Sequence, residues 1–339
     1  MRSYAIRPVA AILSLIFSTA FTLPATPPAD IPRASKYVTV DYSAIDSYAH
    51  NTPDSYARNL NTLSDYLTAP ARSDLAKARS VYAWIMTHIR YDESAYQGRT
   101  YSSEIEYANR VLRNRRAVCT GFALLYKHLL KRAGVLVMNV KGYSRAEDRH
   151  AGVPVGPIDH EWNAIRLDGD WYLLDLAWAS TTAKDGRSND HYFLTEPKQF
   201  VAQHLPADSR WQLLDKPVSK ADFDRFPKFY DAYFRLGFSD DFPKNGLIRS
   251  DGIVTLHFEN EEDVEFLCSY SKRGSATAQP VPMRVGHADG LYTVQVKLPQ
   301  RGTSTLYVFA KPKRPRAERV KSYEGIASFT VVNEPTTLQ

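Results

Sequence analysis

The sequence predicts an α+β domain whose helices pack on an antiparallel sheet, followed by a small β-sandwich. Three observations lead to this prediction. Apolar residues recur at spacings of three and four in the first third of the chain, which is typical of helices. Asp168-Gly169 separates two strand-like stretches and is a strong hairpin signal. After Gly246, short alternating stretches are separated by turn residues, as in a sandwich.

The N-terminal part is predicted to be mainly helical. Residues 42–92 have a helical pattern, and Asp74 can cap a helix within this range. A further helix is expected to begin near Cys119, because an apolar stripe follows it. Lysine and arginine residues crowd the end of that stripe, and Gly134 can terminate the helix.

Strands are expected after this helix. Residues 135–143 form the first, and residues 160–167 and 171–176 form a hairpin around the Asp168-Gly169 turn. Residues 192–194 are expected to form another strand. Residues 145–157 are polar and contain two glycines and two prolines, so we expect a mobile loop that borders the cleft.

The remainder of the chain divides into a connector and the sandwich. Residues 197–245 are too rich in aromatic side chains for a free linker and are expected to wrap around the core. The sandwich strands are expected at 253–258, 264–270, 291–298, 305–310 and 326–332. The predicted organisation is an export signal at 1–20, a flexible leader at 21–36, an α+β domain with its wrap at 37–245, and an Ig-like sandwich at 246–339.

Composition and charge set broad limits on function. Among 339 residues, 44% are hydrophobic and 24% are charged, which suits a globular protein of about two domains. The formal net charge is +6, and two of these charges lie in the expected export signal. Such a mild charge favours contact with an anionic surface such as a cell envelope, but it indicates no nucleic-acid partner.

The N-terminus has the pattern of a signal peptide. Arg2 and Arg7 supply a positive end, an apolar run follows at 9–17, and small residues end at Ala20, where cleavage is expected. We therefore expect a secreted or periplasmic protein. The alternative is a buried N-terminal helix. The apolar run is too short to span a bilayer comfortably, and no later segment of the sequence is apolar enough for a transmembrane segment.

The only two cysteines are Cys119 and Cys268, and they are not expected to pair because they lie in different predicted domains. A free thiol in an oxidising compartment is either deeply buried or used. Cys119 stands where a helix N-terminus is expected, and the dipole of that helix would favour the thiolate form of the cysteine. Arg113, Arg115 and Arg116 precede it closely and are expected to act in the same direction. The alternative is a small buried residue of a helix.

The hairpin predicts a partner pair for this thiol. If Asp168-Gly169 is a two-residue turn, Asp175 lies opposite Trp162, and His160 lies two positions along on the same face. Diagonal neighbours of this kind are about 7 Å apart at Cβ, so an imidazole and a carboxylate can meet. A shift of one residue would separate them onto opposite faces. Thiol catalysis needs a thiolate, a base and a group that orients the base.

These residues lie in motifs that resemble a known family. Ala117-Val118-Cys119-Thr120-Gly121-Phe122-Ala123 resembles the cysteine motif of the transglutaminase-like superfamily. His160-Glu161-Trp162-Asn163-Ala164 and Trp171-Tyr172-Leu173-Leu174-Asp175 resemble its histidine and aspartate motifs. The helix motif from Val81 to Asp92 also fits. His191-Tyr192-Phe193-Leu194-Thr195 and Trp211-Gln212-Leu213-Leu214 are similar to the kyphoscoliosis-peptidase branch.

The resemblance implies a papain/transglutaminase-like core and a thioester formed by Cys119. His160 would be the general base and then acid, and Asp175 would be its partner. The Cys119 backbone N–H would contribute to the oxyanion hole. Two positions depart from the family pattern, since Ala117 replaces a common glycine and Leu176-Ala177 replaces the usual context after the aspartate. Trp84 and Tyr91 are expected to be core aromatics.

Neither a cofactor nor a metal is expected, because no histidine or carboxylate cluster has metal-ligand spacing in the sequence. The expected function is acyl transfer on peptide or amide bonds, with hydrolysis favoured because water is always present. The alternatives are a transglutaminase that cross-links protein or cell-wall peptides, and a non-catalytic envelope-binding module. A basic run between Lys311 and Lys321 is expected to be a solvated loop, or else an anchor to anionic polymers.

Overall fold

The computed structural model describes residues 34–37, 39–95, 101–272, 275, 277–313 and 322–334. The expected export signal and most of the expected leader lie outside these residues, as does most of the basic run. Within the described ranges, no helix combines the length and the apolar character needed to pass through a bilayer.

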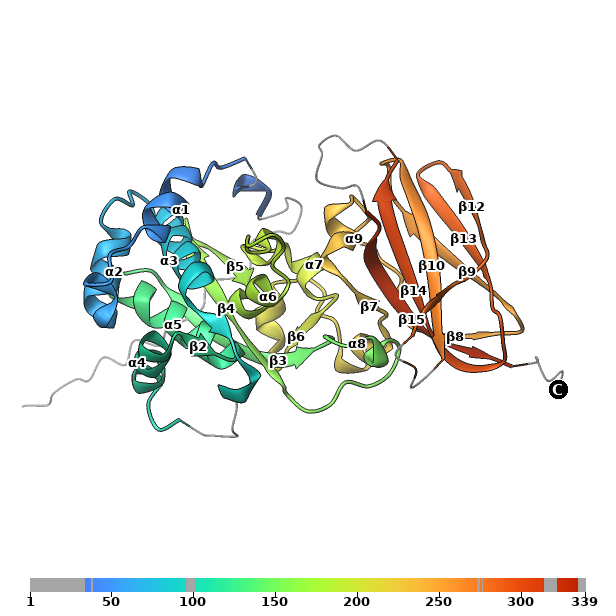
Figure 1. Cartoon of the computed structure of the whole chain (residues 1–339), viewed down its shortest axis with the longest axis horizontal. Helices are drawn as coiled ribbons and strands as arrows, with labels where there is room; N and C mark the ends of the chain where they lie inside the picture. The colour runs from blue at the N-terminus through green and yellow to red at the C-terminus, as the bar shows by residue number, and fades with distance from the viewer. Residues whose placement is uncertain are drawn as a thin grey trace, which may run out of the picture.

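Helices and a four-stranded antiparallel sheet make up the N-terminal part, and strands alone make up the C-terminal part (Figure 1). The sheet has the strand order β5-β4-β3-β6, and α5 packs against β3 and β4. A short parallel pair, β1-β2, lies beside α4 and α5. The elements of this part are α1 Ser43–His50, α2 Leu60–Thr68, α3 Asp74–His88, β1 Arg90–Tyr91, α4 Glu104–Asn114, β2 Arg116–Ala117, α5 Cys119–Arg132, β3 Val137–Ser144, β4 His160–Leu167, β5 Asp170–Leu174, α6 Leu176–Thr181, α7 Pro197–Phe200 and β6 His204–Pro206.

The core of this domain lies between the helices and the sheet. Trp84 and Tyr82 of α3 are fully buried, as are Phe122 and Tyr126 of α5. These side chains form one cluster with apolar residues of the sheet, including Ile165. Burying aromatic rings contributes strongly to stability, because each removes about 150–250 Å² from water. The helical stripes predicted from the sequence are therefore the faces that pack.

Most predicted elements are present, and the exceptions have local causes. Ser73, not Asp74, caps α3, because the Ser73 hydroxyl accepts a hydrogen bond from the Ala76 N–H at 3.2 Å. Residues 192–194 are not a strand. Tyr192 ends a 3-10 turn, and Leu194 has a left-handed backbone (φ +59°), which interrupts any extended run.

The C-terminal part is a two-sheet sandwich. One sheet has the order β11-β10-β14-β15-β7, with β8 also paired to β15, and the other has the order β12-β13-β9. Burial alternates along β9 and β13, which is the expected pattern for strands with one face in the core. The strands are β7 Lys228–Phe229, β8 Leu247–Ser250, β9 Ile253–Glu259, β10 Val264–Lys272, β11 Gln279–Pro280, β12 Met283–Ala288, β13 Leu291–Lys297, β14 Gly302–Pro312 and β15 Glu324–Asn333.

The connector joins the two parts through packed contacts. It contains two further helices, α8 Lys220–Arg225 and α9 Asp231–Arg235, and its strand β7 pairs with β15 of the sandwich. Phe223, Phe229 and Tyr233 are fully buried in the sandwich core cluster, so the connector is packed and is not a free linker.

The segment 145–157 is packed against the connector and the sandwich and is not a free loop. The fully buried Arg145 side chain donates to the backbone carbonyls of His150 and Phe223. The Gly152 N–H donates to the Phe226 carbonyl at 2.8 Å. The carbonyl of the preceding residue, Ala151, accepts a hydrogen bond from the Thr330 hydroxyl at 2.7 Å.

Candidate active site

Cys119 is the first residue of α5, as the sequence predicts. Val118 is extended and precedes the helix, and its carbonyl accepts the first hydrogen bonds from Gly121 and Phe122. A Cβ at Gly121 would lie 2.6 Å from the Ala117 side chain, so glycine allows α4 and β2 to approach this turn closely. The Cys119 side chain is half-buried, and the helix dipole favours negative charge at its sulfur.

His160 and Asp175 come together through the register of the β4-β5 hairpin. Leu167 pairs with Asp170 and Asn163 pairs with Leu174, which is the register expected for a two-residue turn. His160 Nε2 lies 2.6 Å from Asp175 Oδ2, and both side chains are buried. Because Nε2 carries the proton donated to Asp175, Nδ1 is the ring nitrogen available to Cys119.

Asp175 is held by three donors. Its Oδ1 accepts from the Trp178 N–H at 3.0 Å, which makes Asp175 the N-cap of α6. Its Oδ2 accepts from His160 and also from His204 Nε2, at 2.9 Å. This carboxylate is therefore fixed in position, and the proton of each imidazole is assigned to Nε2.

His204 is the site residue that sequence reasoning missed. It opens β6, where Ser144 of β3 is its partner, and this pairing brings it to Asp175 from 29 residues away. Its ring stacks on Phe200 at 4.1 Å and lies 4.4 Å from the Trp178 ring. No local motif predicts this contact. The only signal is a histidine within an aromatic-rich segment.

The electrostatics of the three groups favour an ionised carboxylate. Burial disfavours the charged form of Asp175, but attraction to His160 and hydrogen bonds from both imidazoles lower its pKa well below the usual range. Burial also opposes protonation of His160, yet Asp175 and a hydrogen bond with Cys119 raise the pKa of this imidazole well above its usual value. Burial lowers the pKa of His204 to about 4, so that ring stays neutral at physiological pH.

A cleft of about 450 Å³ opens beside Cys119 and His160. Tyr91 lines it and also packs, partly buried, against the core cluster, where the sequence predicts it, and Trp84 is fully buried as expected. Segment 145–157 borders the cleft through Ala146, as predicted. The lining residues are Tyr91, Glu93, Cys119, Ser144, Ala146, Asp159, His160, Trp178, Thr181, Thr182, Tyr192, Gln203, Lys228, Tyr230 and Asp231.

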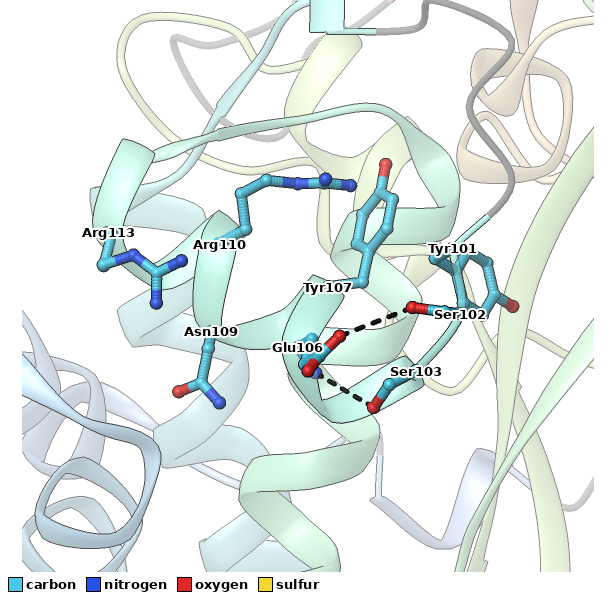
Figure 2. A pocket seen from close by; sticks show the side chains of 8 residues that line it. All are labelled: Tyr101, Ser102, Ser103, Glu106, Tyr107, Asn109, Arg110 and Arg113. Atoms are coloured by element: carbon cyan, nitrogen blue, oxygen red, sulfur yellow. Dashed lines mark hydrogen bonds between the residues drawn. The ribbon is translucent and has the colours of Figure 1, made fainter.

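The three arginines that precede Cys119 do not line this cleft, and the charge effect predicted for them stays a prediction. Arg115 ends α4 in a left-handed turn (φ +57°) and stacks its guanidinium over the Trp84 ring at 4.7 Å. Arg116 pairs with Asp92 at 3.3 Å. Arg113 belongs to a separate polar hollow of about 430 Å³ along α4, which contains none of Cys119, His160 and Asp175 (Figure 2).

The second cysteine is unsuited to chemistry. Cys268 is fully buried in the sandwich, and burial raises the pKa of its thiol to about 12. Both cysteines are free. Cys119 is therefore the thiol that a solvent-borne substrate can reach.

One group of possible metal ligands exists among the described residues. The ligand atoms of His160, Asp175 and His204 lie within 4.8 Å of one another. The sequence predicts no metal site, because these residues have no ligand spacing along the chain. In the structure the same nitrogens donate hydrogen bonds to Asp175, so a metal ion would have to displace both contacts.

Two family models match the chain. Residues 61–176 match the transglutaminase-like superfamily, and residues 220–337 match the KY-like, immunoglobulin-like domain. The chain therefore contains a transglutaminase-like domain, whose fold is related to cysteine proteases and transglutaminases. The first match contains all three of Cys119, His160 and Asp175. The second begins within the aromatic connector and includes β7.

The chain is similar to kyphoscoliosis peptidases. It is 32% identical over 260 residues to that of Mus musculus, which covers 74% of this chain and 38% of the relative. It is 30% identical over 278 residues to that of Homo sapiens, covering 80% of this chain and 40% of the relative. The Lim and transglutaminase domain protein ltd-1 of Caenorhabditis elegans is 29% identical over 244 residues, covering 64% and 32%. The matches thus span about two fifths or less of each relative's length.

Proposed function

We propose that the chain is a cysteine-dependent acyl-transfer enzyme that attacks peptide or amide bonds with Cys119. The observation that carries the proposal is the buried His160–Asp175 pair, 2.6 Å apart, beside a half-buried thiol at a helix N-terminus. A structural cysteine needs neither an imidazole partner nor an open cleft.

In the proposed reaction, His160 Nδ1 takes the proton of the Cys119 thiol, and the sulfur attacks the carbonyl carbon of the substrate. The oxyanion that forms is stabilised by backbone N–H groups at the start of α5, which include that of Cys119. The C–N bond then breaks, and His160 gives its proton to the leaving amine. The acyl group remains on Cys119 as a thioester.

Deacylation completes the cycle. His160 takes a proton from water, and the hydroxide adds to the thioester carbon. The C–S bond then breaks and His160 returns the proton to the sulfur, which releases a carboxylic acid and regenerates the thiol. An amine in place of water would give a new amide instead. Hydrolysis is the proposed outcome, because the cleft is open to solvent and water competes at every turnover.

Export is part of the proposal. The pattern of Arg2, Arg7, the apolar run and Ala20 supports a secreted or periplasmic enzyme. Its peptide substrates would then be extracellular proteins or cell-wall peptides. Immunoblotting of culture fractions for the full-length and shortened chain tests this part separately.

The reaction is tested by trapping the intermediate. The purified chain is mixed with a digest of a denatured protein, quenched in acid and examined by mass spectrometry for an acyl adduct on Cys119. The matched control is Cys119→Ser, with Cys268→Ser as a control for the other thiol. Turnover in ¹⁸O-labelled water with a fluorescent primary amine present then distinguishes the acceptors. Label in new carboxyl groups supports hydrolysis, amine incorporation indicates transglutamination, and neither product nor adduct would contradict an enzymatic role.

A further inference from the structure

Lys228 is a buried lysine in the wall of the candidate active-site cleft. It lies in β7, the strand that the connector adds to the sandwich sheet, and only 4% of its surface is exposed. It lines the cleft together with Cys119 and His160. Among the described residues that form this cleft, it is the one lysine or arginine.

Among the residues that the structure describes, no carboxylate forms an ion pair with Lys228. Its ammonium group lies over the rings of Trp178 and Tyr230, 5.0 and 4.8 Å from their centroids. Within the described part of the chain, no hydrogen bond or ion pair joins this group to another side chain. Burying a lysine in this way is costly, because an ammonium loses its water without gaining a carboxylate.

The acidic residues near Lys228 are engaged elsewhere. Asp148 Oδ1 accepts hydrogen bonds from the hydroxyls of Tyr230 and Ser328. Asp231 accepts from Arg235 at 2.7 Å. These carboxylates are close enough to favour the charged amine, although burial dominates and lowers the pKa of Lys228 to about 8. The amine is therefore still mainly protonated at neutral pH.

The other carboxylates of the cleft do not compensate for this cation. Asp159 accepts from the Ser144 N–H at 2.8 Å and from its hydroxyl at 2.9 Å, so its oxygens are held on β3. Glu93 is exposed. Besides the imidazole of His160, the cleft thus presents one desolvated ammonium group, that of Lys228, in contact with two aromatic rings.

We propose that Lys228 binds a carboxylate of the substrate beside the carbonyl group that Cys119 attacks. This inference rests on the proposed function, and it names the substrate class as acidic acyl donors. An ammonium on aromatic rings can exchange part of that contact for a charge-assisted hydrogen bond to a carboxylate. The carboxylate can belong to an acidic side chain or to a chain end.

The test compares two alkylating agents that differ in charge. Iodoacetate carries a carboxylate and iodoacetamide is its neutral counterpart, so the ratio of their rates at Cys119 reports a cation in the cleft. His160 is present in every variant compared, so its contribution to this ratio is the same in all of them. The Lys228→Met variant isolates the lysine, because methionine keeps the unbranched stem over the rings and removes the charge. Lys272→Met, at an exposed position in the sandwich, is the control for net charge.

We expect the iodoacetate-to-iodoacetamide ratio to fall about three- to tenfold in Lys228→Met, the range expected for a partly buried charge a few ångströms from the anion. Lys228→Arg should keep most of the ratio, and Lys272→Met should leave it unchanged. An equal ratio in Lys228→Met and Lys272→Met would overturn the proposal. Slow labelling by iodoacetamide in every protein would instead count against the proposed thiol enzyme, so the two failures are distinguishable.

A second measurement uses the unaltered protein and does not depend on the variant folding. Two peptidyl chloromethyl ketones are compared that differ only in Glu or Gln next to the reactive group. Faster inactivation by the Glu compound identifies an acidic side chain as the bound group. Equal rates, with the iodoacetate preference present, identify a chain-end carboxylate. Faster inactivation by the Gln compound would contradict recognition of an anion.

Discussion

Replacing His204 with phenylalanine tests the contact that the sequence does not reveal. The ring of His204 is sandwiched by aromatic neighbours, including Phe200 at 4.1 Å and Trp178 at 4.4 Å, so a phenyl ring keeps most of the packing. The substitution removes one hydrogen bond, the 2.9 Å donation from Nε2 to Asp175. His204→Gln is the matched variant, because its amide can still donate.

The expected loss follows from the number of donors on Asp175. A hydrogen bond to a charged group contributes about 1.5–3 kcal/mol. Asp175 keeps its hydrogen bonds from the Trp178 N–H and His160. We therefore expect the activation free energy of Cys119 alkylation to rise by about the lower of these two values. About 1.4 kcal/mol corresponds to a tenfold change in rate. We therefore expect His204→Phe to lower the rate of Cys119 alkylation at neutral pH about tenfold, and His204→Gln to lower it less.

The assay is the second-order rate of iodoacetamide labelling, followed by mass spectrometry across the pH range. Without His204, the pKa of Asp175 should rise and its hold on the His160 imidazolium should weaken. The labelling of His204→Phe should then need a higher pH than that of the unaltered protein. A purely structural role would change urea unfolding without moving this profile. An unchanged rate and pH profile in His204→Phe would refute the idea that His204 positions Asp175 for the reaction.

Three further predictions concern residues that pack or form hydrogen bonds around the site. Gly142→Ala would place a Cβ 2.5 Å from the Trp162 ring, so we expect it to cost about 1–3 kcal/mol of unfolding free energy in urea. Gly156→Ala meets no atom within 4 Å and should change stability by less than about 0.5 kcal/mol; a similar loss in both would contradict the packing argument. Arg145→Met removes the guanidinium that donates to the carbonyls of His150, Val153 and Phe223, and should destabilise the protein by about 2–3 kcal/mol in thermal or urea unfolding, whereas no loss would show that water or the remaining backbone donors replace the guanidinium. Finally, the lowered pKa of His204 means that its neutral form stabilises the fold fully above pH 6.5, and this stability is lost as the pH falls towards 4. Urea unfolding at several pH values should show a loss of up to about 3 kcal/mol that is smaller in His204→Phe, and equal losses in both proteins would contradict the assignment.

The pairing of His160 with Asp175 could be predicted because its determinants are local. A two-residue turn fixes the register of the hairpin, and the register fixes which side chains share a face. The start of α5 at Cys119 is local as well, since an apolar stripe and a terminal glycine mark the helix. These elements depend on residues that are close together in the sequence.

The features that could not be predicted depend on distant contacts. His204 reaches Asp175 because β6 pairs with β3, and Lys228 reaches the cleft because β7 pairs with β15. Neither pairing follows from local periodicity. The position of the Arg115 side chain also depends on a distant residue, because the left-handed turn at Arg115 places its guanidinium over the Trp84 ring. Proximity along the chain to Cys119 is therefore a poor guide to which side chains line its cleft.

The central claim is that Cys119, His160 and Asp175 act as one unit. The most direct test is the pH dependence of Cys119 alkylation by iodoacetamide in the unaltered protein, in His160→Ala and in Asp175→Asn. We expect fast labelling well below about pH 8 that His160→Ala loses and Asp175→Asn weakens. Slow labelling with the profile of an ordinary thiol in all three proteins would contradict the account and would favour a binding role for this fold.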